Sequence, residues 1–231
     1  SDQHTFNVQI DTAPTTIPAT TLEVCDDNFD TFSIFNLLPA GLEVIDGQTG
    51  LTVTYHETIE GAQLGENEIL TPGNYLAITG QVFIRVIETG NTSNCNSIQP
   101  VNLIVHPRPA VPTIEDYALC DDNNSPDETE TFDLTTKDIE VTGGLPGITV
   151  AYYTSQADAQ TGDNPIANPA TYDNTSTPQE IWAAAISDFG CRSISSFDII
   201  VNPLPIVNPA LEPFYSCEEV PGQGEFDFTI M

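Results

Sequence analysis

The chain repeats itself at an interval of about 95 residues. Cys25-Asp26-Asp27-Asn28 recurs as Cys120-Asp121-Asp122-Asn123, and a third version begins with Cys217-Glu218-Glu219, so the cysteines are 95 and 97 residues apart. Self-similarity at a fixed interval means that one folding unit is used several times. A unit of this length exceeds the roughly 20 to 50 residues of common solenoid repeats and has the size of an immunoglobulin-like sandwich.

Further matches between the copies set the boundaries of the units. Gly50–Tyr55 matches Gly147–Tyr152, and a late cysteine, Cys95, matches Cys191. The pattern predicts a last strand of a preceding repeat at 1–13, complete repeats at 14–107 and 108–203, and the start of a third repeat at 204–231.

The periodicity of apolar residues predicts an all-β fold. Leu51–Tyr55 and Ile148–Tyr152 alternate as strands with one buried face, and 82–86 and 181–185 are apolar enough to be central strands. The 18 prolines and 15 glycines suit turns and argue against long helices. We therefore expect tandem immunoglobulin-like β-sandwich modules of about seven strands each, with one helical turn capped by Ser155.

The junctions between units are rich in proline. His106–Pro112 holds three prolines, and Asn202–Pro205 holds two. Such segments favour extended, stiff connections, so the modules are expected to form a rod.

The cysteines recur in an early and a late position of each repeat. Cys25 and Cys95 are 70 residues apart, and Cys120 and Cys191 are 71 apart. This spacing predicts a disulfide inside each module and hence an oxidising compartment, with Cys217 left over. The alternative is a metal site, but the chain has no CxxC, and its three histidines do not recur between the copies.

The charge is extreme, with 4 basic against 34 acidic residues and a formal net charge of -30. Binding to nucleic acid or to an anionic membrane surface needs clustered Lys and Arg, so neither partner is expected. The sequence contains no run of 18 apolar residues, so no membrane-spanning helix is expected, and no signal peptide is visible at the N-terminus. The large negative charge keeps the protein soluble, and the carboxylate groups also favour the binding of divalent cations.

An acidic cluster follows each early cysteine and is the candidate cation site. Oxygen donors at short range on a turn are what Ca²⁺ requires, although neither cluster has the order of an EF-hand. The alternative is a solvated turn in which Asp and Asn cap their own backbone. The candidate ligands are Asp26, Asp27, Asp30, Asp121, Asp122 and Asp127.

Nothing in the sequence predicts catalysis. The scattered histidines do not recur, and no nucleophile elbow, zinc-protease, phosphate-loop or dinucleotide motif is present. Tyr75 and Tyr172 occupy matched positions where they could stack on sugars, but a core or turn role is the stronger expectation.

Several segments of the second copy together form a recognisable pattern. They are Cys120–Asn123 followed by Phe132–Leu134, the centre Tyr152–Ile166, the late Gly190-Cys191 and the exit Val201–Pro205. Through these segments the copies resemble tandem immunoglobulin-like modules of large cell-surface proteins of flavobacteria and related Bacteroidota. Copy one departs at the centre, where Gly61-Ala62-Gln63 stands.

The resemblance implies export by the type IX secretion machinery and display at the cell surface, attached to the outer membrane, in proteins linked to gliding motility or adhesion. The expected function is a non-catalytic adhesin or stalk region whose partners are neighbouring repeats of the chain and surface polysaccharide. The alternative is a set of carbohydrate-binding modules in a larger exported enzyme, and an enzyme is a more distant one.

Overall fold

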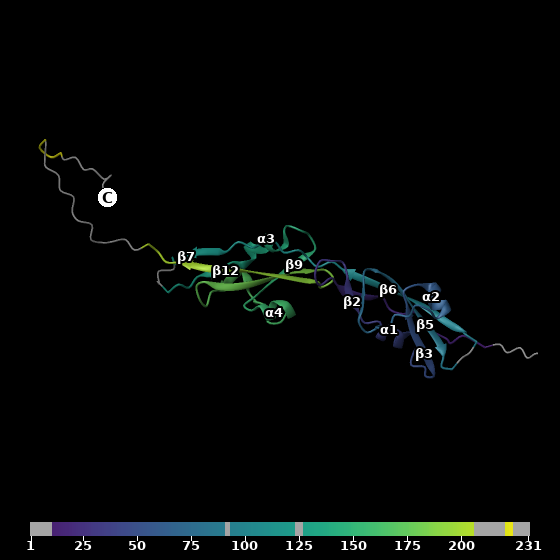
Figure 1. Ribbon diagram of the computed structural model, residues 1–231. Coiled ribbons are helices and arrows are strands. Elements are labelled where there is room, and N and C mark those ends of the chain that lie inside the picture. Colours follow the sequence, from purple (N-terminus) through teal and green to yellow (C-terminus); the bar gives the residue numbers. More distant parts are fainter. Residues whose placement is uncertain (1–10, 91–92, 123–126, 206–219, 224–231) are drawn as a thin grey trace, which may run out of the picture.

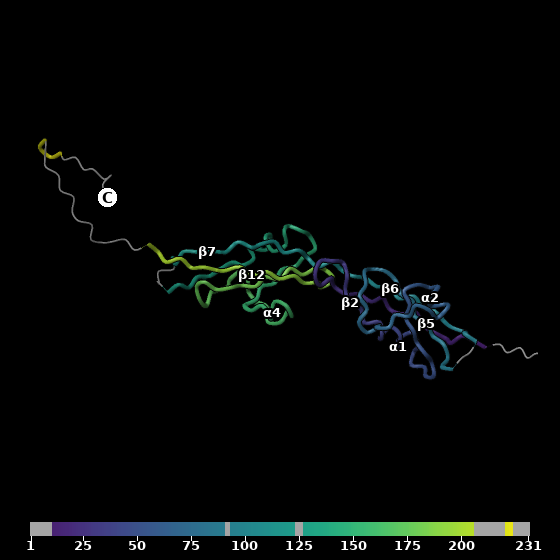
Figure 2. The backbone as a smooth tube through the Cα atoms, in the orientation of Figure 1, coloured from purple at the N-terminus to yellow at the C-terminus, as the bar shows by residue number. Residues whose placement is uncertain are grey.

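The computed structural model describes residues 11–90, 93–122, 127–205 and 220–223. Two β-sheet modules follow one another along the chain and lie end to end, which makes the described part elongated (Figure 1). The backbone trace shows a single short connection leading from the first module to the second (Figure 2). The expected all-β class and the tandem sandwich modules are confirmed. The expected third repeat and Cys217 lie almost wholly outside the described residues.

In the first module a larger sheet packs against a smaller one. β1 runs parallel to β6, and the other neighbours in the larger sheet are antiparallel. Phe35 of the smaller sheet and Ile84 of the larger one, both fully buried, belong to the same apolar core. The larger sheet has the order β1 (Leu22–Cys25), β6 (Asn96–His106), β5 (Gly80–Glu88) and β3 (Leu51–His56), and the smaller one joins β2 (Ser33–Phe35) to β4 (Tyr75–Ala77).

The second module repeats this topology strand for strand. Phe132 takes the place of Phe35, and its core again holds residues from both sheets. The larger sheet has the order β7 (Tyr117–Cys120), β12 (Arg192–Asn202), β11 (Gln179–Ser187) and β9 (Ile148–Tyr153), and the smaller one joins β8 (Thr131–Phe132) to β10 (Tyr172–Asp173).

Short helices replace the seventh strand that we expected in each module. Within the described residues each module has six strands, because the chain between the second and third strands is helical. Leu37, Ala40, Gly41 and Val44 are all buried, and their i, i+3, i+4, i+7 spacing is helical. The helices are α1 (Leu38–Val44), α2 (Ile59–Leu64), α3 (Asp138–Thr142) and α4 (Gln156–Thr161), with 3-10 turns η1 (Leu134–Lys137) and η2 (Pro169–Thr171).

The predicted helical turn capped by Ser155 is α4, where the Ser155 hydroxyl accepts a 3.1 Å hydrogen bond from the Asp158 N–H. α4 covers the outer face of the large sheet, where Ala159 packs with Ala184 of β11. The opposite face of β11 contributes Ala183 and Ala185 to the sandwich core. The central strand is therefore buried on both faces, as its apolar sequence predicted.

Candidate functional site at the module junction

A disulfide bond joins the two modules. Cys25, the last residue of β1, is bonded to Cys191, which precedes β12, with 5.5 Å between their Cα atoms. The bond spans 166 residues of sequence. In the chain-entropy model, closing a loop of this length is worth about 5 kcal/mol relative to the unfolded chain. The modules are thus connected twice, by the peptide linker and by this bond.

The predicted disulfides Cys25–Cys95 and Cys120–Cys191 are wrong. Cys25 pairs in register with His106 at the end of β6, whereas Cys95 precedes Asn96 at the start of the same strand. β6 has 11 residues, so the two cysteines are about 33 Å apart along it. A disulfide requires roughly 4.4 to 6.8 Å between Cα atoms. The same geometry along β12 separates Cys120 from Cys191.

Each module therefore carries its early cysteine at one end and its late cysteine at the other. At the junction, the early cysteine of the first module meets the late cysteine of the second. In the described part of the chain, Cys95 and Cys120 are free thiols at the two outer ends. Cys120 is exposed and Cys95 is half-buried.

Arg108 of the linker contacts both modules. Its Nε donates to the Ser193 hydroxyl of β12 at 2.8 Å, and its Nη1 donates to the Asp27 carbonyl oxygen at 2.6 Å. The guanidinium carbon also lies 4.8 Å from the centre of the Phe29 ring. One of only four basic residues in the chain is thus used to hold the junction.

An imidazole and a phenyl ring stack across the same junction. The His106 and Phe189 ring centres are 3.8 Å apart, with 16° between the ring planes. His106 Nε2 lies 2.7 Å from a carboxylate oxygen of Glu23. The Cys191 Sγ lies 3.8 Å from the His106 carbonyl oxygen, so the end of β6 is in contact with the disulfide.

Asp26 organises the loop that meets the linker. Its Oδ1 accepts hydrogen bonds from the N–H groups of Asn28 and Phe29 at 3.1 and 2.8 Å, and its Oδ2 accepts one from Thr31 at 2.8 Å. Burial acts to raise the pKa of Asp26, but these backbone donors outweigh it and lower the pKa. They also hold Phe29 and Thr31 at φ angles of 68° and 69°, where residues with side chains are strained.

The other acidic residues of the clusters form hydrogen bonds within the turns that contain them. Asp30 accepts from the Phe32 N–H at 2.8 Å, and Asp127 accepts from the Thr129 N–H at 3.1 Å. Asp121 accepts from the Glu128 N–H at 3.1 Å, and the Asp122 N–H donates to Glu130 at 2.9 Å. Across the described ranges, no three His, Cys, Asp or Glu side chains gather in a group that could hold a metal ion. Calcium binding stays a prediction.

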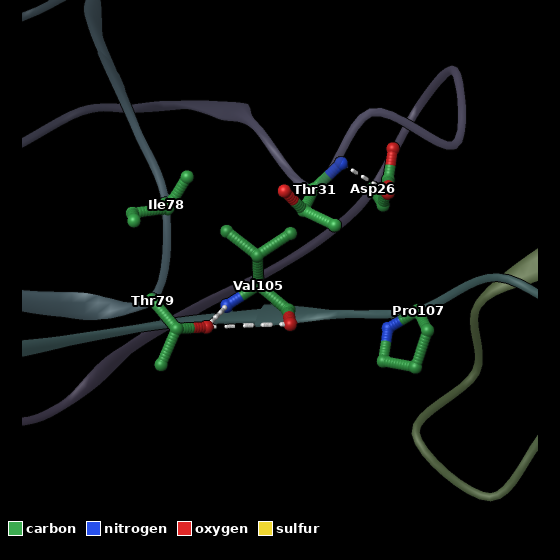
Figure 3. A pocket seen from close by; sticks show the side chains of 6 residues that line it. All are labelled: Asp26, Thr31, Ile78, Thr79, Val105 and Pro107. Carbon is green, nitrogen blue, oxygen red and sulfur yellow. Dashed lines mark hydrogen bonds between the residues drawn. The ribbon is translucent and has the colours of Figure 1, made fainter.

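A hollow of about 400 Å³ lies beside the junction. Figure 3 shows Asp26 and Thr31 from the acidic loop on one side, and Ile78, Thr79, Val105 and Pro107 on the other. The Thr79 hydroxyl accepts from the Val105 N–H at 2.9 Å and thereby closes the end of the sheet. The lining of this hollow is mostly apolar, and no acid–base pair is found among its lining residues.

The fold and this crosslinked junction define the chain as a pair of tandem extracellular repeat modules, because disulfides persist in oxidising compartments. The family model of the Flavobacterium inter-domain disulphide bond domain matches residues 21–109 and 116–205. The chain belongs to this family. No curated protein matches the chain.

Several solved structures are similar to the chain at low identity. Sidekick-1 immunoglobulin domains 1-4 match at 12% identity over 83% of this chain and 49% of that one, with a TM-score of 0.30. The human Desmocollin-1 ectodomain matches at 10% over 84% and 42%, with a TM-score of 0.22. The Bacteroides ovatus SGBP-B in complex with a mixed-linkage heptasaccharide matches at 11% over 78% and 43%, with a TM-score of 0.21. The chain thus spans about half or less of their lengths.

None of the helices in the described ranges has the length and apolar character that a membrane span needs. Tyr75 and Tyr172, the matched tyrosines, both pack against the core of their module, as expected from a core or turn role.

Sequence reasoning missed Arg108, Phe29, Phe189 and Ser193 as parts of the junction. Their signal was weak, since only the scarcity of basic residues made Arg108 conspicuous.

Proposed function

We propose that the chain is a non-catalytic repeat region of an extracellular stalk or adhesin, in which disulfides between successive modules keep the array stiff. The Cys25–Cys191 bond carries this proposal, because it adds a second connection beside the linker. Two rigid bodies that are joined at two points lose most of their freedom to bend. The Arg108 and His106 contacts act in the same direction.

The partners in this proposal include neighbouring repeats of the same chain, joined by the same kind of bond. Cys95 Sγ lies 3.3 Å from the Asp11 carbonyl oxygen, as Cys191 Sγ lies 3.8 Å from that of His106. Asp11 and His106 are themselves 95 residues apart, which is the repeat interval. We expect Cys95 to bond with the early cysteine of a repeat before it, and Cys120 with the late cysteine of a repeat after it.

Export by the type IX secretion machinery, attachment at the outer membrane and a part in gliding motility or adhesion to surface polysaccharide complete the proposal. Membership in a flavobacterial family supports this setting, and an inter-module disulfide suits an exported protein. The test is protease accessibility of the protein on intact flavobacterial cells, compared with cells that lack type IX export. Surface exposure in both strains would contradict the export route.

Small-angle X-ray scattering tests the stiff stalk. We expect the oxidised chain to keep one long maximum dimension, and we expect dithiothreitol to broaden the distance distribution toward bent forms. The variant Cys25→Ser/Cys191→Ser should behave like the reduced wild type without reductant. Cys120→Ser is the matched control, since Cys120 forms no bond in this part of the chain. Identical scattering before and after reduction would overturn the proposal.

A further inference from the structure

The outer face of the small sheet in the first module is apolar. Ile34 of β2 and Leu76 of β4 are cross-strand partners, and 52% and 61% of their surfaces are exposed. The next residues in the same register, Phe32 and Ile78, are 44% and 49% exposed. We call these four residues the β2–β4 face. An outer face of a sandwich is normally polar, because it meets water.

The second module shows that the fold does not need this apolar surface. There Phe132 pairs with Tyr172 as Phe35 pairs with Tyr75, so Thr131 and Asp173 occupy the places of Ile34 and Leu76. The Thr131 hydroxyl donates to Asp173 at 2.6 Å. Thr129 and Thr175 stand at the positions of Phe32 and Ile78. The same architecture therefore forms with four polar residues, and the β2–β4 face is specific to the first module.

A hollow of about 280 Å³ adjoins the β2–β4 face and has an acidic rim. Phe32, Leu76, Ile78 and Tyr75 line it together with Glu57, whose carboxylate accepts a 3.2 Å hydrogen bond from the Tyr75 hydroxyl. A second carboxylate, that of Asp30, is next to Phe32, because it accepts a hydrogen bond from the Phe32 N–H at 2.8 Å. At the position of Glu57 the second module has Thr154, so this acid also belongs to the first module alone.

We propose that the β2–β4 face docks a partner protein through a segment that alternates apolar and basic side chains. The apolar side chains would cover Phe32, Ile34, Leu76 and Ile78, and the basic ones would meet Glu57 and Asp30. A contiguous exposed apolar surface with a polar rim is the form of a protein interaction site. The negative charge of the rim favours a partner segment with positive charge.

Charge and chemistry disfavour the other occupants. A second copy of the chain carries the same net charge of -30, and two such chains repel each other. A glycan presents hydroxyl groups that need hydrogen-bond partners when they are buried. Three of the four side chains of the β2–β4 face are aliphatic and therefore have no hydrogen-bonding groups to offer to such hydroxyls.

This inference deepens the proposed function by naming an adhesive surface, and it rests on that function only for the extracellular setting. The stiff stalk is measured by scattering, whereas docking is measured by binding. Each can therefore fail without the other.

Binding of synthetic peptides to the whole oxidised chain tests the proposal. The probes are a strand-length peptide that alternates Leu and Lys, one that alternates Leu and Glu, and one that alternates Ser and Lys. We expect only the Leu/Lys peptide to bind measurably at physiological salt, because it alone offers both the apolar and the basic groups.

The variant Ile34→Thr/Leu76→Asp copies the residues of the second module and is therefore expected to fold, which thermal unfolding checks. It should bind the Leu/Lys peptide at least about tenfold more weakly, as expected for truncated contacts at the centre of an interface. Because Leu76→Asp adds a negative charge, general attraction between an acidic chain and a basic peptide would change affinity in the opposite direction.

Four results would overturn the proposal. They are absence of Leu/Lys binding to the wild type, equal binding by the wild type and Ile34→Thr/Leu76→Asp, self-association in sedimentation that this variant abolishes, and binding of a soluble mixed-linkage glucan that this variant abolishes. The third result would assign the face to a second copy, and the fourth would assign it to a glycan.

Discussion

The Nε of Arg108 donates a 2.8 Å hydrogen bond to the hydroxyl oxygen of Ser193, so a residue of the linker is fixed to the start of strand β12 in the second module. Ser193 is only 4% exposed. The same guanidinium donates to the carbonyl oxygen of Asp27 in the first module. The orientation of the modules therefore depends on one cation as well as on the disulfide.

Replacing Arg108 by alanine should expose the Cys25–Cys191 bond to reduction. A hydrogen bond of a charged group is worth about 1.5 kcal/mol or more, so losing this contact allows the junction to open roughly tenfold more often. We expect dithiothreitol to reduce the bond several-fold faster in Arg108→Ala than in the wild type, with the rate measured by titration of the released thiols. Arg108→Lys is the control for charge, and it should also react faster because an ammonium cannot bridge both modules as the planar fork does. Equal rates in all three proteins would contradict this role.

Peptide mapping without reductant should find a single crosslinked pair that contains Cys25 and Cys191. Since the chain has only four Lys and Arg residues, cleavage after Glu and after aromatic residues is the practical route. We expect Cys25→Ser to release a reactive Cys191 thiol and Cys95→Ser to leave the crosslink intact. A peptide that joins Cys25 to Cys95 would contradict the junction described above.

The sequence predicted the strands well because their apolar alternation reports burial directly. β3, β5, β9 and β11 each include the segment that was expected to be a strand. The helix α1 was not predicted although Leu37, Ala40 and Val44 have helical spacing, because the segment is only seven residues long and contains a proline and a glycine.

The cysteine pairing could not be predicted from spacing. The nearly equal separations of 70 and 71 residues fit a bond within a module and also fit a head-to-tail arrangement of similar modules. What decides between them is the length of β6 and β12, which places the two cysteines of a module at opposite ends. The sequence indicated strands over the second halves of β6 and β12, but neither the full length of these strands nor their order in the sheet was visible.

Stability of the first module should depend on pH through Asp26. Burial acts to raise the pKa of this carboxyl, but hydrogen bonds from Asn28, Thr31 and Phe29 lower it below its ordinary 3.8. A lowered pKa in the folded state gives stabilisation that is fully present above the unfolded pKa. It is lost as pH falls from about 3.8 through the folded pKa.

Asp26→Asn is therefore expected to lower the urea midpoint at pH 7, because an amide cannot accept all three N–H groups. The difference from the wild type should shrink as the pH falls below the ordinary pKa of 3.8. Asp27→Asn, one residue further on the same exposed loop, is the matched control and should leave the midpoint almost unchanged. A difference between Asp26→Asn and the wild type that stays constant with pH would rule out this linkage.

Calcium binding at the acidic loops is testable by chelation. If Ca²⁺ binds the native clusters, it stabilises the folded chain by mass action, so the thermal midpoint should rise with added CaCl₂ and fall with EGTA. Asp122→Asn/Asp127→Asn should abolish the rise from the second module, and MgCl₂ controls for general screening of the negative charge. An unchanged midpoint in EGTA would end the calcium hypothesis.

The two modules place a guanidinium under the same helix end from different strands. In the first module Arg85 of β5 lies under Gly65 at the end of α2, and in the second Arg192 of β12 lies under Gly162 at the end of α4. Arg192 donates to the Tyr153 hydroxyl at 2.8 Å and to the carbonyl oxygen of Ala159 at 3.1 Å. A cation at this place stabilises the C-terminal end of a helix.

This difference predicts unequal costs for one substitution in the two copies. Both glycines have positive φ angles, 72° at Gly65 and 89° at Gly162, so alanine costs about 1 kcal/mol at either. At Gly162 the new Cβ would stand 2.5 Å from Nη2 of Arg192, whereas at Gly65 it would stand 3.4 Å from Cζ of Arg85. Gly162→Ala therefore shifts the end of the Arg192 side chain, and we expect the resulting loss of its hydrogen bonds to add about 1 to 2 kcal/mol.

Urea denaturation separates the two effects, because the one tryptophan of the chain, Trp182, lies in β11 and reports on the second module. We expect Gly162→Ala to shift the Trp182 transition by about 2 to 3 kcal/mol in total, and Gly65→Ala to leave that transition in place. Far-UV circular dichroism of Gly65→Ala should show the smaller loss in the first module. Equal losses from the two substitutions would mean that Arg192 adapts without losing its hydrogen bonds, and the helix ends would then be equivalent in both copies.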